Sequence, residues 1–422
     1  MHIAFLVALV TCSLYYLLAR RPIDFLTVGF GSSVIYFLPG IVGYTLTPTT
    51  PGSPIKLPVA LDPEVYAIMR AGLVGITFGT VVYDLRQRAR STERKFIRLE
   101  QAPLAAWIAA ALGVLGFLMT WLSSEGSVFN PDKRVVMESV GRWHILWEMS
   151  ASFSVLFGMA YRRPVCILVG VALVLIDMYV GFRYAFALTF VSCLVYKLSE
   201  LGPVIIGRLK ARYWIGALLG GIMVISYQNL KAPIRAGDWA EVGTRVSSLA
   251  WWGGGILTSE PFTTQTILNE IVSRDFRTDT DHLVSSVHQF IMFAPQLGAE
   301  SVRFGDIYQP SLFPLVDHGL ANNIWAQMWS AGGWLLLTAF ILFHAFVLAL
   351  GSRLLGASDP GLRVFVVLFF SYWAFYIHRN ELLVQLGFQK QSTIVWAMCM
   401  FFGIILSRAA VQRRFASRTL SP

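Results

Sequence analysis

Four cationic side chains stand at the ends of apolar segments, at positions suited to binding an anion. Arg183 occupies a short turn between two apolar runs, Lys231 and Arg235 follow a third run, and Arg379 follows a fourth. Arginine binds phosphate oxygens through parallel N–H groups and keeps its charge, whereas lysine acts as a point charge. Fixed cations at a membrane surface suit a diphosphate whose lipid tail stays in the bilayer. We therefore expect these four residues to bind such a group.

Arg183 and Arg379 each have a second interpretation. Arg183 would snorkel to the aqueous interface if it did not face a cavity inside the bundle. Arg379 precedes Glu381 by two positions, so these two could form an interfacial ion pair. Asp177 and Glu148 lie inside apolar segments, where we interpret them as structural partners of nearby arginines rather than as catalytic groups.

His318 is a candidate for accepting a proton. It stands beside Asp317 just before a later apolar segment, although a lone histidine is often only a polar surface residue. Trp239 could stack on a sugar, but tryptophans are common at any membrane interface. The four cysteines all lie in apolar segments, and their spacing predicts neither a disulfide framework nor a metal site. We therefore expect no metal and no cofactor.

The rest of the sequence indicates that a membrane positions these residues. Of the 422 residues, 55% are hydrophobic and 14% are charged, which is outside the soluble range. Runs of about twenty apolar residues match the helix length that crosses a bilayer. We expect an all-α polytopic protein with eleven transmembrane helices, at residues 2–19, 22–46, 65–85, 103–122, 144–161, 164–180, 184–198, 213–228, 322–350, 364–378 and 391–407.

A polar segment, residues 229–321, separates the spans of residues 1–228 from those of residues 322–422. Apolar residues at helical spacing predict two helices inside it, at residues 264–272 and 279–293. Such helices would lie on the membrane surface or pack on the span ends. Long segments of this kind usually have a function, so we expect a large, partly helical loop that covers the cations, with a purely structural lid as the alternative.

The basic residues orient the spans. Connections after the odd-numbered spans, from Arg20 to the C-terminal tail, hold most of the lysines and arginines. The positive-inside rule then places the tail in the cytoplasm, the large loop on the opposite side and the N-terminus outside. We interpret the net charge of +10 as topological and expect no nucleic-acid partner.

The order of these features resembles that of the Wzy-type polymerases of lipid-linked oligosaccharides, such as O-antigen polymerases. Gly181-Phe182-Arg183 resembles the family's Gly-x-Arg turn between two adjacent spans. Lys231 and Arg235 resemble its basic pair at the start of the large loop.

Two later segments extend the resemblance over roughly residues 160–395. Residues 290–295 resemble a Phe-x-x-x-Pro element inside the loop, and residues 318–323 with Gly332-Gly333 resemble the loop exit. Related O-antigen ligases have a histidine followed by Asn, Ser or Gln, then nine residues and a glycine. Here Asn322-Asn323 and Gly333 have that spacing, so an asparagine stands in place of the ligase histidine, which favours a polymerase. Some polymerases carry Arg-x10-Gly repeats in two outer loops. No glycine stands at that distance after Arg142, Arg235, Arg245, Arg274, Arg277 or Arg303.

The resemblance implies a GT-C-like fold in the bacterial inner membrane, with the site on the periplasmic side. A growing glycan would move from undecaprenyl diphosphate onto the nonreducing sugar of a lipid-linked repeat unit. Arg183, Arg235 and Arg379 would stabilise the leaving diphosphate without a metal. The residues expected to contact the substrates beside them are Lys231, Asp317, Asn322, Glu381, Asp238 and Trp239.

The acceptor hydroxyl would need at most one base. His318, Asp317, Asp238 and Glu381 are the candidates, and the sequence does not rank them. The implied partners are undecaprenyl diphosphate-linked oligosaccharides, membrane lipid and a chain-length co-polymerase. An O-antigen ligase and a non-catalytic transporter or flippase for lipid-linked sugars remain the alternatives.

Overall fold

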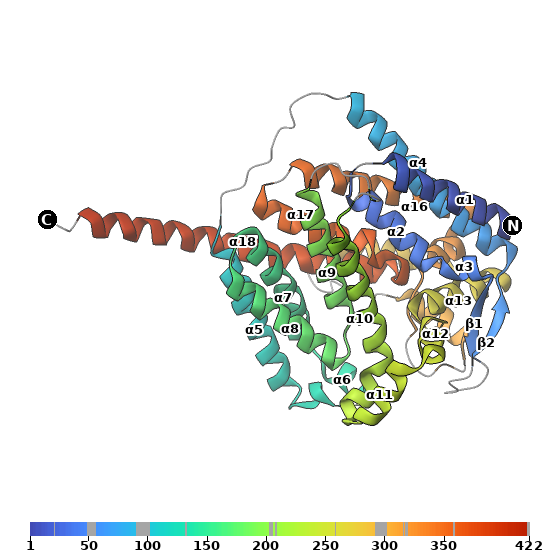
Figure 1. The fold of residues 1–422 in the computed structure, drawn as a ribbon, viewed down its shortest axis with the longest axis horizontal. Helices are drawn as coiled ribbons and strands as arrows, with labels where there is room; N and C mark the ends of the chain where they lie inside the picture. The colour runs from blue at the N-terminus through green and yellow to red at the C-terminus, as the bar shows by residue number, and fades with distance from the viewer. Residues whose placement is uncertain are drawn as a thin grey trace.

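A computed structural model of the chain describes residues 1–20, 22–48, 56–89, 102–130, 133–201, 206, 209–257, 259–291, 302–314, 316, 320–357 and 359–419. The described part is mostly helical (Figure 1). In chain order the elements are α1 (His2–Leu14), η1 (Tyr15–Ala19), α2 (Phe25–Tyr36), α3 (Leu38–Val42), β1 (Tyr44–Pro48), β2 (Lys56–Ala60), α4 (Pro63–Ala89), α5 (Ala105–Ser123), η2 (Ser127–Phe129), α6 (Lys133–Ser139), α7 (Arg142–Ala160), α8 (Pro164–Val180), α9 (Tyr184–Ser199), α10 (Ala211–Ala236), α11 (Trp239–Ser247), α12 (Leu249–Leu257), α13 (Glu260–Ser273), α14 (Asp281–Ile291), α15 (Phe304–Leu312), α16 (Ile324–Ala357), α17 (Pro360–Ala374), η4 (Tyr376–Arg379) and α18 (Leu382–Thr419).

Five helical segments of the described chain are long and apolar enough to cross a membrane. They are His2–Ala19, Pro63–Gln87, Ala105–Ser123, Ile324–Gly356 and Leu382–Ala409. The helices α2, α8, α9 and α17 are apolar but shorter. This composition is that of a helical membrane protein, and the number of eleven spans stays a prediction.

The segment predicted as the second span is divided. Helix α2 ends at Tyr36, α3 ends at Val42, and β1 starts at Tyr44. Gly43 ends α3 in the left-handed region, with φ of 93°, a conformation that glycine adopts without steric cost. The predicted loop that follows contains a β-hairpin, in which β1 pairs antiparallel with β2 and Tyr44 lies opposite Ala60. The Thr45 hydroxyl donates to the Phe262 carbonyl at 2.9 Å and so joins the hairpin to α13.

Helices α5, α7 and α8 pack closely because glycines face the neighbouring backbone. A Cβ added at Gly116 of α5 would lie 2.5 Å from the backbone nitrogen of Trp147 in α7. A Cβ added at Gly170 of α8 would lie 2.8 Å from the carbonyl oxygen of Ala151. Small residues allow such close approach between helices in membranes.

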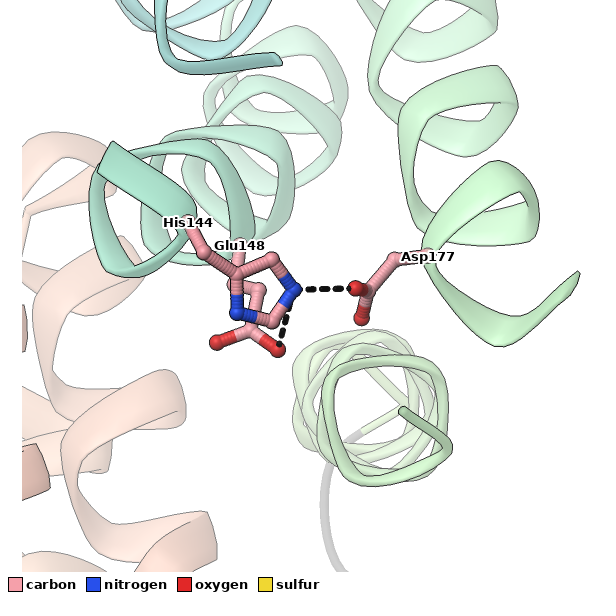
Figure 2. A group of neighbouring side chains, drawn as sticks. All are labelled: His144, Glu148 and Asp177. Carbon is pink, nitrogen blue, oxygen red and sulfur yellow. Dashed lines mark hydrogen bonds and ion pairs between the residues drawn. The ribbon is translucent and has the colours of Figure 1, made fainter. Parts of the chain in front are cut away.

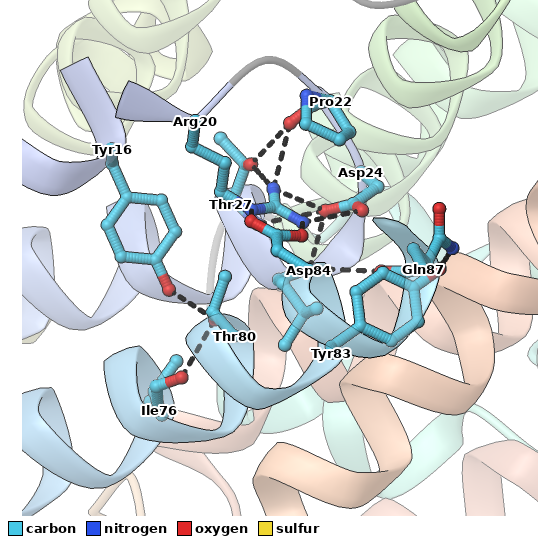
Figure 3. Close-up of polar contacts among 12 residues, drawn as sticks. Tyr16, Arg20, Pro22, Asp24, Thr27, Ile76, Thr80, Tyr83, Asp84 and Gln87 are labelled. Carbon is cyan, nitrogen blue, oxygen red and sulfur yellow. Dashed lines mark hydrogen bonds and ion pairs between the residues drawn. The ribbon is translucent and has the colours of Figure 1, made fainter. Parts of the chain in front are cut away.

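A buried arginine joins η1, α2 and α4 (Figure 3). Arg20 is 2% exposed and donates to Asp24 at 2.8 Å and to Asp84 at 3.2 Å. Nearby, the hydroxyl groups of Tyr16 and Thr80 lie 2.6 Å apart. Removing one partner of such a buried pair typically costs about 3–5 kcal/mol because it leaves an uncompensated charge. Arg20 therefore holds three helices together, besides the orienting role predicted for it.

The two helices predicted in the large loop are present. Helix α13 buries Ile267, Leu268 and Ile271, as their spacing predicts. Helix α14 packs against α18 and buries Leu283 of the predicted apolar face, but Val284 and Val287 of the same face are 64% and 44% exposed. The end of α18 extends away from the other helices (Figure 1).

Candidate functional site

Glu260 receives two of the four predicted cations. Its Oε1 accepts a hydrogen bond from Arg183 at 2.7 Å, and Arg379 donates to the same oxygen. Arg183 precedes α9, Glu260 is the first residue of α13, and Arg379 ends η4. Three separate parts of the chain therefore meet at one carboxylate, and Arg183 is engaged inside the protein rather than snorkelling freely.

The turn between α8 and α9 positions Arg183. Gly181 has φ of 120°, which lets α8 end abruptly. The backbone N–H groups of Gly181 and Phe182 both donate to the Asp177 carbonyl at 3.1 Å. The next residue is Arg183, so this turn sets the direction in which its side chain leaves.

Lys231 and Arg235 extend the group. Both lie in the last turns of α10, which continues to Ala236. Burial lowers the pKa of Lys231, and repulsion from Arg183 and Arg235 lowers it further. Arg235 donates to the Asn130 carbonyl. Arg183, Lys231, Arg235 and Arg379 are called the cation cluster below.

The cation cluster brings several positive charges near Glu260. Burial by itself would lower the pKa of Arg379, but interactions with Glu260, Tyr376 and Tyr36 together outweigh burial and raise that pKa, so Arg379 stays protonated. Arg183 and Arg379 contact Glu260, and Lys231 is close enough to Arg183 and Arg235 to be repelled by them. Such a group of cations attracts a further anion, and a diphosphate has the charge and the oxygen atoms to contact several of them.

Tyrosines line the same place. The Arg379 guanidinium lies 5.1 Å from the centre of the Tyr376 ring. Tyr376 in turn contacts Tyr184, which follows Arg183, with ring centres 5.7 Å apart. Tyr36 of α2 is close enough to interact electrostatically with Glu260 and Arg379. Tyr36 and Tyr376 are only 3% and 6% exposed, so these rings pack against the arginines inside the protein.

The start of α16 lies against the cluster. The Asn322 N–H donates to the Arg379 carbonyl at 3.0 Å. Asn323 is buried, and its Oδ1 caps α16 by accepting from Trp325 N at 2.9 Å and from Ala326 N at 3.1 Å. The predicted proximity of the loop exit to Arg379 therefore holds for Asn322, whereas Asn323 has a structural role.

Glu381 does not make the ion pair with Arg379 that the sequence offered as an alternative. Its Oε2 accepts from the backbone N–H of Phe304, at the first turn of α15. Burial raises the pKa of Glu381 to about 7. Glu381 can therefore exchange a proton near neutral pH, but its contact with Phe304 is that of a group that holds α15.

Of the other predicted site residues, Asp238 and Trp239 are at the start of α11. His318 and Asp317 lie outside the described residues, as does most of the Phe-x-x-x-Pro segment. Asp238 caps α11 by accepting from the backbone N–H of Glu241 at 2.9 Å. Trp239 is 68% exposed on that helix.

A buried triad beside the cation cluster was not predicted. His144 Nε2 lies 2.7 Å from Asp177 Oδ1 and 3.3 Å from Glu148 Oε1 (Figure 2). The sequence predicted arginine partners for these carboxylates, and in the described residues His144 contacts both of them. The spacing of His144 and Glu148, four residues apart on one helix face, is the signal that could have found them.

Glu260 was missed for a different reason. It is the first residue of α13, inside the loop, and nothing in its neighbourhood along the chain indicates arginine partners 77 and 119 positions away.

A cavity of about 580 Å³ lies at another part of the loop, lined by residues that include Arg277, His282 and Val302. The residues that line this cavity do not include the cation cluster, so the cavity and the cation cluster are in different places. His282 stacks on Phe304 with ring centres 5.6 Å apart, and Phe304 binds Glu381, so the cavity lies close to the α15 contact.

No protein-family model, curated protein or solved structure matches this chain.

Proposed function

We propose that this protein is a glycosyltransferase of the bacterial inner membrane that uses lipid-linked diphosphate sugars on the periplasmic side. The resemblance of the Gly181–Arg183 turn and the basic pair to Wzy-type polymerases suggests the reaction. The supporting observation is the cation cluster, in which Arg183 and Arg379 share Glu260 while Lys231 and Arg235 stand next to them.

The reaction transfers a glycan from undecaprenyl diphosphate to a sugar hydroxyl of a second lipid-linked repeat unit. The hydroxyl oxygen bonds to the anomeric carbon as the bond from that carbon to the diphosphate oxygen breaks. The diphosphate leaves with the electron pair, and the hydroxyl proton passes to a base or to water. Negative charge grows on the diphosphate in the transition state, so cations fixed beforehand lower the barrier.

Arg183 and Arg379 are the groups that would bind the leaving diphosphate, and Lys231 and Arg235 would add charge. A guanidinium group binds phosphate oxygens through two parallel N–H groups, and it stays protonated. Lys231 has a pKa lowered by its cationic neighbours, and a bound diphosphate would offset that repulsion. Because arginine and lysine supply the positive charge, the reaction needs no added divalent cation.

Glu260 would be displaced as the diphosphate binds. It occupies the two arginines in the absence of substrate and belongs to α13 of the loop. Exchange of Glu260 for phosphate oxygens would loosen the loop at the moment the substrate enters, and the loop would then cover the glycan.

The test is a polymerisation assay on purified protein in detergent, with one lipid-linked repeat unit as the substrate and no added metal. A ladder of longer products is expected. Arg183→Ala and Arg379→Ala should each reduce it at least 100-fold, in line with the loss of one transition-state contact of this kind. Arg274→Ala serves as the matched control, because Arg274 pairs with Glu270 on the surface of α13.

Two results would contradict the polymerase, and a third would change its proposed site. Product that appears only after lipid A core is added indicates a ligase. Binding of the lipid-linked unit without any bond formation, under every condition, indicates a transporter. A normal ladder from either cluster variant removes that arginine from the site.

A further inference from the structure

Three ionisable side chains lie together in an apolar part of the bundle. His144 and Glu148 come from α7 and Asp177 from α8, and Figure 2 shows all three directed at one point between the helices. His144 is 5%, Glu148 1% and Asp177 0% exposed. Their nearest ligand atoms all lie within 4.8 Å of one another. These residues are called the buried triad.

The charges of the buried triad do not balance by themselves. Two carboxylates placed this close repel each other and cannot both ionise without positive charge between them. A protonated His144 would supply one positive charge and leave these three side chains with a net charge of −1. The three taken together become neutral with two bound protons, one on His144 and one shared by the carboxyl groups, or with one divalent cation and a neutral imidazole.

Glu148 is the second observation that points to a ligand. No hydrogen bond from the described residues reaches either of its carboxylate oxygens, although the side chain is 1% exposed. His144 Nε2 is 3.3 Å from Oε1, an ion-pair contact, while it makes its shorter contact of 2.7 Å to Asp177. A buried carboxylate without a donor costs several kcal/mol, and either a proton shared with Asp177 or a bound cation removes that cost.

We propose that His144, Glu148 and Asp177 bind one divalent transition-metal cation of the zinc class. One imidazole nitrogen with two carboxylate oxygens is a donor set that suits Zn²⁺, Mn²⁺ or Fe²⁺ better than Ca²⁺, which prefers oxygen donors alone.

The distances are close to those that such an ion requires. Zinc binds imidazole nitrogen and carboxylate oxygen at about 2.0–2.2 Å, so tetrahedral ligand atoms are about 3.3 Å apart. The contact of 3.3 Å between His144 and Glu148 matches this spacing. The contact of 2.7 Å to Asp177 would lengthen by about 0.6 Å when an ion replaces the proton between them.

The surroundings favour a tightly held ion. Val128, Trp147, Leu173 and Val180 form an apolar cluster at this end of α7 and α8, and Phe182 packs on the His144 ring with ring centres 4.4 Å apart. An apolar shell excludes water and strengthens metal–ligand attraction. The cation would therefore be structural.

The buried triad also touches the turn that carries Arg183. The Asp177 backbone carbonyl accepts the N–H groups of Gly181 and Phe182, and Phe182 packs on His144. A cation that fixes Asp177 and His144 would hold the end of α8 against α7 and so fix the direction of Arg183. Its site is separate from the cation cluster, where the diphosphate would bind.

The test is metal analysis of the full chain purified in detergent without chelator, followed by titration of the metal-free protein with Zn²⁺ against a chromophoric competitor. One Zn²⁺ per chain is expected. Glu148→Gln and Asp177→Asn should each weaken binding at least 10-fold, the size of effect that even a supporting residue of a metal site produces. His282→Gln is the matched control, because His282 is also buried and lies outside the triad.

Substitution in the triad can destabilise the protein by itself, so the spectrum of the wild-type chain with Co²⁺ is a second measurement. Absorption bands of a site with nitrogen and oxygen ligands are expected, and they should vanish when Zn²⁺ is added. If the wild-type chain binds less than 0.1 ion per chain and shows no Co²⁺ bands, the triad holds protons only and the proposal is wrong.

Discussion

Among single residues, Glu260 has the central place in the cation cluster because it contacts two of the arginines. Its one carboxylate oxygen contacts Arg183 and Arg379, and both guanidinium groups are partly exposed, at 20% and 24%. Solvent screening limits the value of each contact to about 1 kcal/mol or less. A diphosphate has more oxygen atoms and more charge than Glu260, so it can compete for the same two arginines.

Glu260→Gln should tighten binding of a lipid diphosphate. The neutral amide competes less well for the arginines, and a gain of about 1 kcal/mol corresponds to about fivefold in the dissociation constant. The measurement is titration of the purified protein with undecaprenyl diphosphate in detergent.

Glu241→Gln is the matched control, because Glu241 pairs with Arg245 on the exposed helix α11 and should leave affinity unchanged. Weaker binding by Glu260→Gln would show that Glu260 contacts the ligand directly.

Glu381 should make stability depend on pH. Burial raises its pKa from 4.5 to about 7, so between these values the folded chain keeps a proton that the unfolded chain has lost. The free energy of unfolding therefore falls as pH rises through this window, by at most about 3 kcal/mol. Thermal unfolding between pH 5 and pH 8 measures the effect.

Glu381→Gln removes this dependence and is compared with the wild-type chain at each pH. Burial lowers the pKa of His282, which makes stability change in the opposite direction, but that contribution is present in both proteins. Equal pH dependence of the two proteins would exclude Glu381 as its cause.

The kink of α16 connects the large loop to the bundle at the scale of elements. Gly332 and Gly333 leave the helical conformation, and Gly333 has φ of 55° and ψ of −146°. Arg277 of the loop donates to the Trp329 carbonyl at 3.0 Å, and the Thr278 N–H donates to the Ser330 carbonyl at 3.0 Å. Non-helical backbone at membrane depth is tolerated where protein groups satisfy it, as here.

Gly333→Ala should destabilise the protein by about 1–3 kcal/mol. Its backbone conformation is one that residues other than glycine rarely adopt. Crowding is not the cause, because an added Cβ would meet only Arg277 Nη1 at 3.5 Å. Thermal or denaturant unfolding in detergent measures the difference.

Gly31→Ala is the control, since Gly31 is helical and an added Cβ there meets no atom within 4 Å. A change of less than about 1 kcal/mol, or a small gain, is expected for Gly31→Ala. Equal stability of the two variants would show that the kink is not strained.

The orientation of the whole molecule in the membrane decides which compartment the cation cluster faces. The positive-inside rule predicts that residues 229–321 and the tail lie on opposite sides. Five helical segments of the described chain are long and apolar enough to cross the membrane. The prediction assigns the connections between the spans to one side or the other.

Arg274→Cys and Ser417→Cys, each in a chain whose four native cysteines are replaced, should label differently with a membrane-impermeant maleimide. The Arg274 side chain is 56% exposed, so a cysteine there is reachable. In cells with a permeabilised outer membrane, Arg274→Cys should label, whereas Ser417→Cys should label only after lysis. The reverse pattern would place the cluster in the cytoplasm and contradict a periplasmic reaction.

Sequence by itself determined the helices and the candidate cations. Apolar runs of span length predict helices that overlap those of the structure, because a helix satisfies its own backbone groups without reference to the rest of the chain. Arg183, Lys231, Arg235 and Arg379 were recognisable because a charge next to such a run is costly and therefore rarely accidental.

Only the tertiary structure decided the partners of these residues. Arg183 and Arg379 meet at Glu260, and His144 meets Asp177, through packing between segments that local periodicity does not relate. The β-hairpin and the exposed side chains of α14 also result from long-range packing. The hairpin contacts α13, and α14 buries the side chains that face α18. Periodicity shows that a helix forms and which side chains share a face, while long-range packing determines what that face contacts.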